Sequence, residues 1–431
     1  MPPRILVLGA GGREHALAWR LARDPEHPEV LVAPGNDGMG VMFRRVHVRE
    51  TDPDAVVELA RRERVALVVV GPEAALAAGV SDALAAAGIA VSGASRAAAQ
   101  LESSKWFAKQ VMLEAGVPTA AAEVFADTAR ATAALARFGP PWVVKADGLA
   151  AGKGVLVTSS PEEALAFVRD CLERGRFGEG GRRVVLEQHL AGEEASVIAV
   201  CDGERHVLLP AARDYKRAED GDRGPNTGGM GAFAPTPAVT EEVERAVSER
   251  VIAPVLAKLA ARGTPYRGAL YAGLMLTATG PRVIEFNARF GDPETQSVLP
   301  LLGGSLGTLL ASAARGALEP AAVSRMQGAT VTVALVDEGY PTAVRGGGVI
   351  QGLDEVVGGV DDHLLVFHAG TRREHGEWVV RGGRAAYLTA RGDNLDQARA
   401  RAYAARATLK GAGWRSRGDV AASLASPARS A

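Results

Sequence analysis

The chain has 431 residues, of which 47% are apolar and 23% are charged, and its formal net charge is −1. A chain of this length exceeds what one hydrophobic core usually holds, so we expect two to four domains. The near-zero net charge provides no general positive field, which argues against a general binder of polyanions. We therefore expect no nucleic-acid partner and no membrane partner.

The beginning of the chain and its two cysteines indicate the compartment. The apolar run before Arg13 covers only residues 5–8 (ILVL), which is too short for a signal peptide or a membrane span. Cys171 and Cys201 lie 30 positions apart and form no CxxC motif, which fits reduced thiols and no structural zinc. We therefore expect a cytoplasmic protein, and nothing in the sequence conflicts with a monomer.

Three apolar runs near the start predict buried strands at residues 4–8, 30–33 and 66–70. The first run leads into a predicted helix over about residues 15–23. The glycines between them resemble a dinucleotide-binding fingerprint, but Glu14 stands where GxGxxG needs its third glycine. An NAD-dependent oxidoreductase is therefore the weaker alternative.

Each of these predicted strands ends on a turn, and such carboxyl ends line the ligand crevice of an open α/β sheet. The groups found there suit a phosphate and a ribose better than a purine ring. The alternative is that they are ordinary turn residues. The candidate substrate-binding residues in these turns are Gly11, Gly12, Arg13, Asn36 and Glu73.

Residues 143–157, VVKADGLAAGKGVLV, are the stretch around which we expect the nucleotide site to form. Two β-branched runs flank a loop with glycines and two lysines, which predicts a strand, a glycine-rich turn and a returning strand. Glycines let backbone N–H groups approach phosphate oxygens, and lysines add positive charge. A Walker A loop has four residues between its first glycine and Gly-Lys and continues as a helix, whereas here there are three and a strand follows. The alternative is a mobile hairpin with an incidental lysine pair.

Lysine is scarce in this chain, since only seven of its 49 basic residues are lysines. We expect those that remain to be enriched where arginine cannot replace a compact ammonium group. Lys109, Lys258 and Lys410 are predicted on helix surfaces. The stretch over residues 184–200 predicts two strands around a hinge that can bind adenine, with Glu194 at a ribose or, alternatively, solvated. The predicted ATP-binding residues are Lys105, Lys145, Gly152, Lys153, Gly154, Glu187, Gln188, Leu190, Glu194 and Lys216.

A strand predicted over residues 282–286 carries the candidate metal site. Glu285 and Asn287 alternate onto one face of it, and their oxygens are ligands that Mg²⁺ (or Mn²⁺) accepts beside substrate phosphates. Arg289 lies on the same face if the strand continues. Many strands carry such a pair, so this signal is weak by itself.

Residues 213–231 form a long polar stretch without periodicity, and such loops in compact proteins are usually functional or disordered. The tract from Asn226 to Gly229 predicts a backbone nest for an anion. Beyond about residue 326 the pattern changes to short strands and a final helix over 395–411, with many arginines that form either a solvated face or a phosphate-facing patch. The candidate substrate-binding residues of the polar stretch are Asp214, Asn226, Thr227 and Gly228.

Eight tracts along the chain together resemble the glycinamide ribonucleotide synthetase (phosphoribosylamine–glycine ligase) family of the ATP-grasp superfamily. The tracts are GGREHALAW (11–19), APGN (33–36), VGPEA (70–74), KADGLAAGKGV (145–155), GPNTGGMGA (224–232), LYAGLM (270–275), VIEFNARFGDPETQ (283–296) and FHAGT (367–371). The chain departs from the family pattern at Arg213, where glutamine is expected, at ESSK (102–105), where EGSK is expected, and in its tail over residues 414–420.

The resemblance implies an α/β protein with the ATP-grasp fold, an N-terminal Rossmann-like (pre-ATP-grasp) domain and a small β-rich C-terminal cap domain. The expected domains are residues 1–102, residues 103–327 with a mobile lid at about 123–186, and residues 328–431. The implied substrates are ATP, glycine and 5-phosphoribosylamine, which react through glycyl phosphate to glycinamide ribonucleotide, ADP and phosphate in purine biosynthesis.

The resemblance also assigns roles to two catalytic candidates. Asp292 is expected to orient the substrate amine, and Arg289 to bind either the glycine carboxylate or a phosphate. Residues 269–276 include no acidic metal ligand, so metal coordination should depend more on phosphates and water. The alternatives are another ATP-grasp carboxylate–amine ligase, the NAD-dependent oxidoreductase, and a nucleotide-binding regulatory protein without chemistry.

Overall fold

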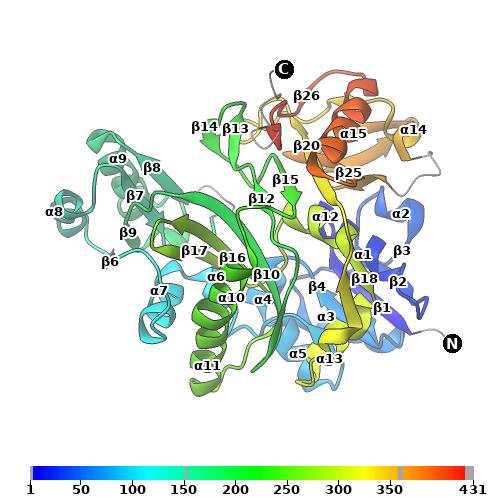
Figure 1. Cartoon of the computed structure of the whole chain (residues 1–431), viewed down its shortest axis with the longest axis horizontal. Helices are drawn as coiled ribbons and strands as arrows, with labels where there is room; N and C mark the ends of the chain where they lie inside the picture. The colour runs from blue at the N-terminus through cyan, green and yellow to red at the C-terminus, as the bar shows by residue number, and fades with distance from the viewer. Residues whose placement is uncertain (1–2, 151–153, 358–362, 423–431) are drawn as a thin grey trace.

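The structure is a computed structural model that describes residues 3–150, 154–357 and 363–422. An N-terminal sheet and a central sheet lie side by side, a lid projects from the central sheet, and a C-terminal sheet lies against both sheets (Figure 1). No helix of the described residues is both long and apolar enough to cross a membrane.

The N-terminal sheet is parallel, with the strand order β3-β2-β1-β4-β5, so the first strand is central. The inner strands of this sheet are apolar on both faces, as expected for a parallel sheet whose two faces are both covered by other elements of the chain. The strands are β1 (Arg4–Gly9), β2 (Glu29–Pro34), β3 (Arg44–Arg45), β4 (Leu67–Val70) and β5 (Val91–Ser92), and the helices are α1 (Gly12–Leu21), α2 (Met39–Met42), α3 (Pro53–Arg62), α4 (Glu73–Ala78) and α5 (Val80–Ala86). The three predicted strands are confirmed, and α1 begins earlier than expected, at Gly12.

The central sheet is antiparallel, with the order β11-β10-β16-β17. Leu8 of the N-terminal sheet and Leu270 and Phe286 of the central sheet belong to the same buried cluster, so the two sheets form one body. The strands are β10 (Glu193–Asp202), β11 (His206–Leu208), β16 (Arg267–Thr277) and β17 (Gly280–Asn287), and the helical segments around them are α6 (Gln100–Ser103), α7 (Lys105–Glu114), α10 (Glu241–Val247), η2 (Ser248–Ile252), α11 (Ala253–Ala261), α12 (Glu294–Val298), η3 (Leu299–Leu301), α13 (Leu306–Ala314) and η4 (Pro320–Ala322). A short antiparallel pair, β18 (Leu302–Gly304) and β19 (Val323–Arg325), is formed by the segments before and after α13 in the chain.

The lid is an antiparallel sheet with the order β6-β9-β7-β8, and two helices cover it. It has a separate buried core that includes Val144, Phe167 and Leu186. Its elements are β6 (Ala122–Phe125), α8 (Thr128–Phe138), β7 (Trp142–Ala146), β8 (Val155–Thr158), α9 (Pro161–Leu172), η1 (Gly178–Gly181) and β9 (Val184–Gln188). The predicted hairpin strands are therefore present as β7 and β8.

The C-terminal sheet has the order β12-β15-β20-β25-β22, with β26 on β20. Its first two strands come from the polar stretch 213–231 and its continuation, which the sequence analysis treated as a loop. That expectation is wrong in part, because β15 pairs with β20, about 100 residues later in the chain, and β12 pairs with β15. The elements of this region are β12 (Arg213–Asp214), β13 (Arg217–Glu219), β14 (Arg223–Asn226), β15 (Gly231–Ala234), β20 (Ala329–Asp337), β21 (Val349–Ile350), α14 (Leu353–Val357), β22 (Leu364–His368), β23 (Thr371–Glu374), β24 (Glu377–Val380), β25 (Arg384–Gly392), α15 (Leu395–Thr408) and β26 (Trp414–Arg415).

Candidate active site

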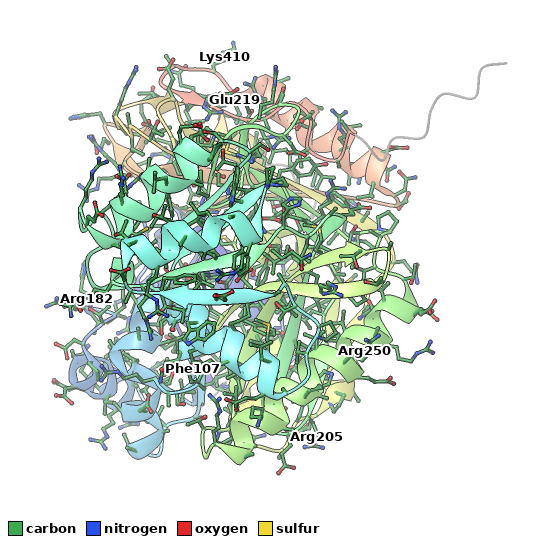
Figure 2. All side chains as sticks on the ribbon, turned by 90° about the vertical axis from the view of Figure 1, so that its left-hand side faces the viewer. Phe107, Arg182, Arg205, Glu219, Arg250 and Lys410 are labelled. Atoms are coloured by element: carbon green, nitrogen blue, oxygen red, sulfur yellow. The ribbon has the colours of Figure 1, made fainter. Side chains whose placement is uncertain are left out.

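The candidate active site lies where the lid meets the central sheet. In Figure 2 the lid faces the viewer, and helix α7, which carries the labelled Phe107, lies below it. Lys145 of lid strand β7 donates to the backbone carbonyl of Ile284 on β17 at 3.0 Å. This contact brings the predicted ATP-binding strand to the strand that carries the predicted metal ligands.

Glu187 of β9 is the centre of a buried charge group. Its carboxylate is 3.0 Å from Lys145 Nζ and 3.4 Å from Lys109 Nζ. Burial by itself would raise the pKa of Glu187, but the two lysines outweigh burial and lower it. The placement of Lys109 on a helix surface is wrong: only 1% of the residue is exposed, and Lys109 Nζ donates to Thr119 Oγ1 at 2.8 Å and Ala120 O at 3.1 Å. Burial lowers the pKa of Lys109 to about 8.

Two further lysines pair with acids on the central sheet. Lys105, at the start of α7, lies 3.1 Å from Glu285 on β17, and it is the main cause that holds the pKa of Glu285 far below its usual range. Lys216 lies 2.9 Å from Glu194 on β10 and 4.0 Å from Asp214. Burial raises the pKa of Asp214 to about 8, although Lys216 acts in the opposite direction. Positive and negative groups thus alternate across the site.

Glu285 and Asn287 lie two positions apart on β17, as predicted from alternation along a strand. The position of β16 opposite Glu285 is Gly273, which carries no ligand. In the amide orientation that satisfies its neighbours, the side-chain nitrogen of Asn287 donates a hydrogen bond to Glu102 Oε1 at 3.3 Å. Within the described residues no group of three or more His, Cys, Asp or Glu side chains could hold a metal. A carboxylate and an amide are donors that fit Mg²⁺ only if it also takes phosphate oxygens and water.

The glycine-rich loop joins the lid to α7 through Asp147, a residue that the sequence analysis did not select. Asp147 Oδ1 accepts from the backbone N–H of Trp106 at 2.7 Å and from Ser104 Oγ at 2.9 Å, and its other oxygen pairs with Arg183. The carbonyl of Asp147 accepts from the N–H of Lys105 at 2.8 Å. Asp147 therefore caps the helix that presents Lys105. One sequence signal could have identified Asp147: it is an acidic residue followed by glycine, next to the predicted strand that carries Lys145.

The remaining predicted ATP-binding residues surround this loop. Gly152 and Lys153 lie outside the described residues. Gly154 closes the hairpin, because its carbonyl accepts from the N–H of Ala146 at 2.8 Å. At the end of β9 the side chain of Gln188 is exposed, and Leu190, just beyond, is half-buried.

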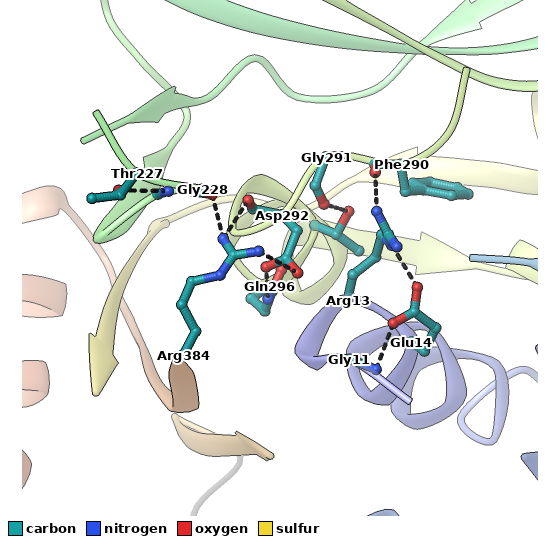
Figure 3. A network of polar contacts seen from close by, with 12 residues as sticks. Gly11, Arg13, Glu14, Thr227, Gly228, Phe290, Gly291, Asp292, Gln296 and Arg384 are labelled. Atoms are coloured by element: carbon teal, nitrogen blue, oxygen red, sulfur yellow. Dashed lines mark hydrogen bonds and ion pairs between the residues drawn. The ribbon is translucent and has the colours of Figure 1, made fainter. Parts of the chain in front are cut away.

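The turn after β1 is filled by Glu14 (Figure 3). Its carboxylate accepts from the N–H of Gly11 at 2.7 Å and from Arg13 Nε at 2.6 Å. A Cβ on Gly71, in the neighbouring turn, would come within 2.1 Å of Glu14 Oε1. A dinucleotide pyrophosphate needs this space and these N–H groups, so the geometry speaks against the NAD-dependent alternative.

The other candidates in these turns have partners within the chain. Asn36 donates to the carbonyls of Ala10 at 2.8 Å and His368 at 2.9 Å and accepts from the N–H of Met39 at 2.9 Å, so its amide organises the turn. Gly12 lies against the C-terminal sheet, because a Cβ there would meet the ring of Tyr387 at 2.3 Å.

Arg289 follows β17 and is held by two carboxylates. Its guanidinium lies 3.2 Å from Glu73 Oε2 and 3.0 Å from Glu102 Oε1. Glu102 is buried and also accepts from the N–H of Ala288 at 2.8 Å. The structure thus joins two predicted residues, Arg289 and Glu73, that lie 216 positions apart.

Asp292 lies in the turn after Arg289 and contacts the C-terminal sheet (Figure 3). Asp292 Oδ2 is 3.1 Å from Arg384, and Asp292 Oδ1 accepts from Gln296 Nε2 at 2.8 Å. Burial would raise the pKa of Asp292, but Arg384 and Arg13 lower it. Arg384 is a residue that the sequence analysis did not select, because it lies among many arginines with no local motif.

The tract 226–229 is not free to form an anion nest in this structure. The N–H of Thr227 donates to Lys216 O at 2.8 Å, the N–H of Gly228 donates to the Tyr340 hydroxyl at 2.8 Å, and the N–H of Gly229 donates to Thr227 Oγ1 at 3.0 Å. In this structure C-terminal and neighbouring residues occupy these three N–H groups, so the nest stays a prediction for this tract. Asn226 lies in the β13–β14 hairpin, opposite Arg217.

Comparisons with known protein families match this chain in three successive regions. The N domain of phosphoribosylglycinamide synthetase matches residues 3–102, its ATP-grasp (A) domain matches residues 103–295, and its C domain matches residues 330–423. This confirms the expected fold class.

The relatives cover nearly the whole chain. A phosphoribosylamine–glycine ligase of Caulobacter vibrioides is 48% identical over 96% of this chain and 97% of the relative, and one of Streptomyces coelicolor is 48% identical over 98% and 99%. A solved phosphoribosylamine–glycine ligase of Thermotoga maritima has a TM-score of 0.80 at 33% identity, covering 96% of this chain and 99% of that chain. A biotin carboxylase domain of Hydrogenobacter thermophilus, at 17% identity and a TM-score of 0.71, shares the fold over 96% of this chain and 91% of its own. The chain belongs to the phosphoribosylglycinamide synthetase family.

Proposed function

We propose that the protein ligates glycine to 5-phosphoribosylamine with ATP, forming glycinamide ribonucleotide, ADP and phosphate in purine biosynthesis. The main support is the convergence of Lys105, Lys145 and Lys216 on Glu285, two positions before Asn287, at the junction of lid and central sheet, in a chain that aligns over nearly its whole length with phosphoribosylamine–glycine ligases. Another ATP-grasp carboxylate–amine ligase remains the second candidate.

The reaction activates a poor electrophile. A glycine carboxylate oxygen attacks the γ-phosphoryl group, ADP leaves, and the resulting acyl phosphate is captured by the amine of phosphoribosylamine, which expels phosphate and loses a proton. Enzymatic phosphoryl transfer depends mainly on positioning and charge neutralisation. We assign neutralisation to Lys105, Lys145, Lys153 and Lys216, with no nucleophilic side chain.

We propose that Glu285 and Asn287 hold Mg²⁺ or Mn²⁺ together with phosphate oxygens. The metal would supply charge neutralisation between the phosphates when bound. Because Lys105 pairs with Glu285, we infer that this lysine balances the carboxylate before the metal–nucleotide complex enters.

We propose that the lid, about residues 123–186, closes over ATP and keeps water from the acyl phosphate. Its separate core supports movement as a unit. The proposed domain division is residues 1–102, 103–327 and 328–431. Residues of the polar stretch and of the strand-end turns stay candidates for the phosphoribosyl group, and Arg289 stays a candidate for the glycine carboxylate or a phosphate.

We also propose that the protein works in the cytoplasm as a monomer without nucleic-acid or membrane partners. Its two cysteines are buried, and burial raises the pKa of Cys171 to about 12, so neither is poised for thiol chemistry.

A phosphate-release assay across a panel of amino acids, with and without phosphoribosylamine, tests the function. We expect release that needs both glycine and phosphoribosylamine. Release with another carboxylate in place of glycine would favour the second candidate. Thermal stabilisation by NAD instead of Mg-ATP would refute the ligase proposal.

A further inference from the structure

Arg384, the first residue of β25, reaches from the C-terminal sheet into the site. Its Nη1 donates to the carbonyl of Asp292 at 2.9 Å and to the carbonyl of Gly228, and its Nη2 lies 3.1 Å from Asp292 Oδ2. One guanidinium thus contacts two chain segments from the middle of the sequence (Figure 3). Its side chain is 20% exposed and that of Asp292 is 12% exposed, so solvent screens this pair only weakly.

These two segments, around Gly228 and Asp292, also pack closely against each other. A Cβ on Gly229 would come within 2.3 Å of Pro293 Cδ, and the φ angle of Gly229 is 113°, so only glycine fits this position without strain. The other backbone group of Gly228, its N–H, donates to the Tyr340 hydroxyl at 2.8 Å. Both polar backbone groups of Gly228 are therefore held by side chains of the C-terminal region, Arg384 of β25 and Tyr340 of the turn after β20.

The two carboxylate oxygens of Asp292 contact different parts of the chain. Oδ1 accepts from Gln296 of α12, whereas Oδ2 faces Arg384. Without the guanidinium, only the uncharged side chains of Gln296 and Tyr387 would hold the carboxylate, and Arg13, which is buried nearby, would become its main charged neighbour. The direction in which Asp292 presents its oxygens thus depends on a residue from another part of the chain.

We propose that Arg384 is a positioning residue, which fixes the Asp292 carboxylate and the Gly228 carbonyl as one unit and so makes the amine-capture half of the reaction depend on the C-terminal sheet. This inference rests on the proposed function. A planar guanidinium can donate to both groups at once, and a lysine ammonium cannot reproduce that fixed fork. Formation of the acyl phosphate, at Lys145 and Glu285, does not involve this contact.

The test separates the two halves of the reaction in the full-length protein. Hydroxylamine traps the acyl phosphate as glycyl hydroxamate without phosphoribosylamine, and ligated product is measured separately. For Arg384→Ala we expect kcat for ligated product to fall by about 100-fold, the size seen when a catalytic group is displaced by about 1 Å. Hydroxamate formation should stay within about threefold of wild type. Arg384→Lys should show an intermediate loss, and added guanidinium ion should partly restore Arg384→Ala.

Arg415→Ala is the matched control. Arg415 joins the same regions by donating to Ala218 O at 2.7 Å and to Tyr340 O at 2.8 Å, but it does not touch Asp292. We expect this variant to keep near-normal rates for both products. An equal loss in both variants, or an equal loss of both products in Arg384→Ala, would assign Arg384 a structural role and overturn the inference.

A higher KM for phosphoribosylamine with unchanged kcat would also overturn the inference, because it would make Arg384 a direct substrate contact. If the wild-type protein forms neither product from glycine, the proposed function fails and this inference fails with it. If wild type forms both products, only the behaviour of the variants decides.

Discussion

Glu187→Gln should loosen the lid, because it removes the one carboxylate between two buried lysines. The substitution keeps the size of the side chain, while the side chains of Lys109 and Lys145 are only 1% and 3% exposed. Removing one partner of a buried ion pair costs about 3–5 kcal/mol. At about 3 kcal/mol, opening of strands β7 and β9 should be roughly 150-fold more frequent.

The loss should also depend on pH in a defined direction. Burial lowers the pKa of Lys109, and the negative charge of Glu187 raises it. Without that charge, the pKa of Lys109 in the variant should be lower still. A lysine whose pKa is lowered by folding destabilises the protein most below that pKa, and the penalty disappears as pH rises towards the unfolded value. The deficit should therefore be larger at pH 6 than at pH 10.

Hydrogen exchange of residues 142–146 and 184–188 measures this opening without assuming two-state unfolding of the whole chain. Glu123→Gln is the matched control, because Glu123 lies in the same lid sheet but pairs with Arg137 at the surface, where a pair contributes at most about 1 kcal/mol. Adding Lys109→Met to Glu187→Gln should restore part of the protection. Exchange in Glu187→Gln that is no faster than in Glu123→Gln would show that the buried carboxylate does not hold the lid strands together.

Other residues give three further predictions. Because burial raises the pKa of Asp214 to about 8, its ionised form is disfavoured in the fold, so the Tm advantage of Asp214→Asn over wild type should widen as pH rises from 5 to 9; a constant gap would contradict this. Burial lowers the pKa of His15 to about 3 and of His368 to about 4, so stability should fall as pH drops from about 6.5 towards 4, and less so in His368→Phe; equal acid sensitivity would show that these rings are not responsible. Glu285→Gln should need several-fold more Mg²⁺ for half-maximal rate, and an unchanged Mg²⁺ requirement would exclude Glu285 as a ligand.

Local patterns predicted the elements whose burial is set by their own sequence. Apart from Arg4, the runs at 4–8, 30–33 and 66–70 are apolar on both faces and too short for ordinary helices, which indicates buried strands, and they form β1, β2 and β4. The alternation of Glu285 and Asn287 likewise needed only the period of a strand.

Residues whose environment comes from distant segments could not be predicted in this way. Lys109 has a helical neighbourhood, but β9 and the segment after α7 bury it. The local sequence of the tract 226–229 predicts an anion nest. In the structure Tyr340 and Arg384, more than 100 positions away in the chain, form hydrogen bonds with the backbone of Gly228. Strands β12 and β15 are too short to show a period; the register of β15 is set by β20, and that of β12 by β15.

In the proposed reaction the glycine carboxylate attacks ATP to form an acyl phosphate. Turnover of glycine carrying ¹⁸O in both carboxylate oxygens, with Mg-ATP and phosphoribosylamine, tests it directly by mass analysis of the released phosphate. We expect one glycine oxygen in each released phosphate, because the oxygen that attacks the γ-phosphoryl group leaves with it. Phosphate without the label, formed together with glycinamide ribonucleotide, would exclude an acyl phosphate intermediate.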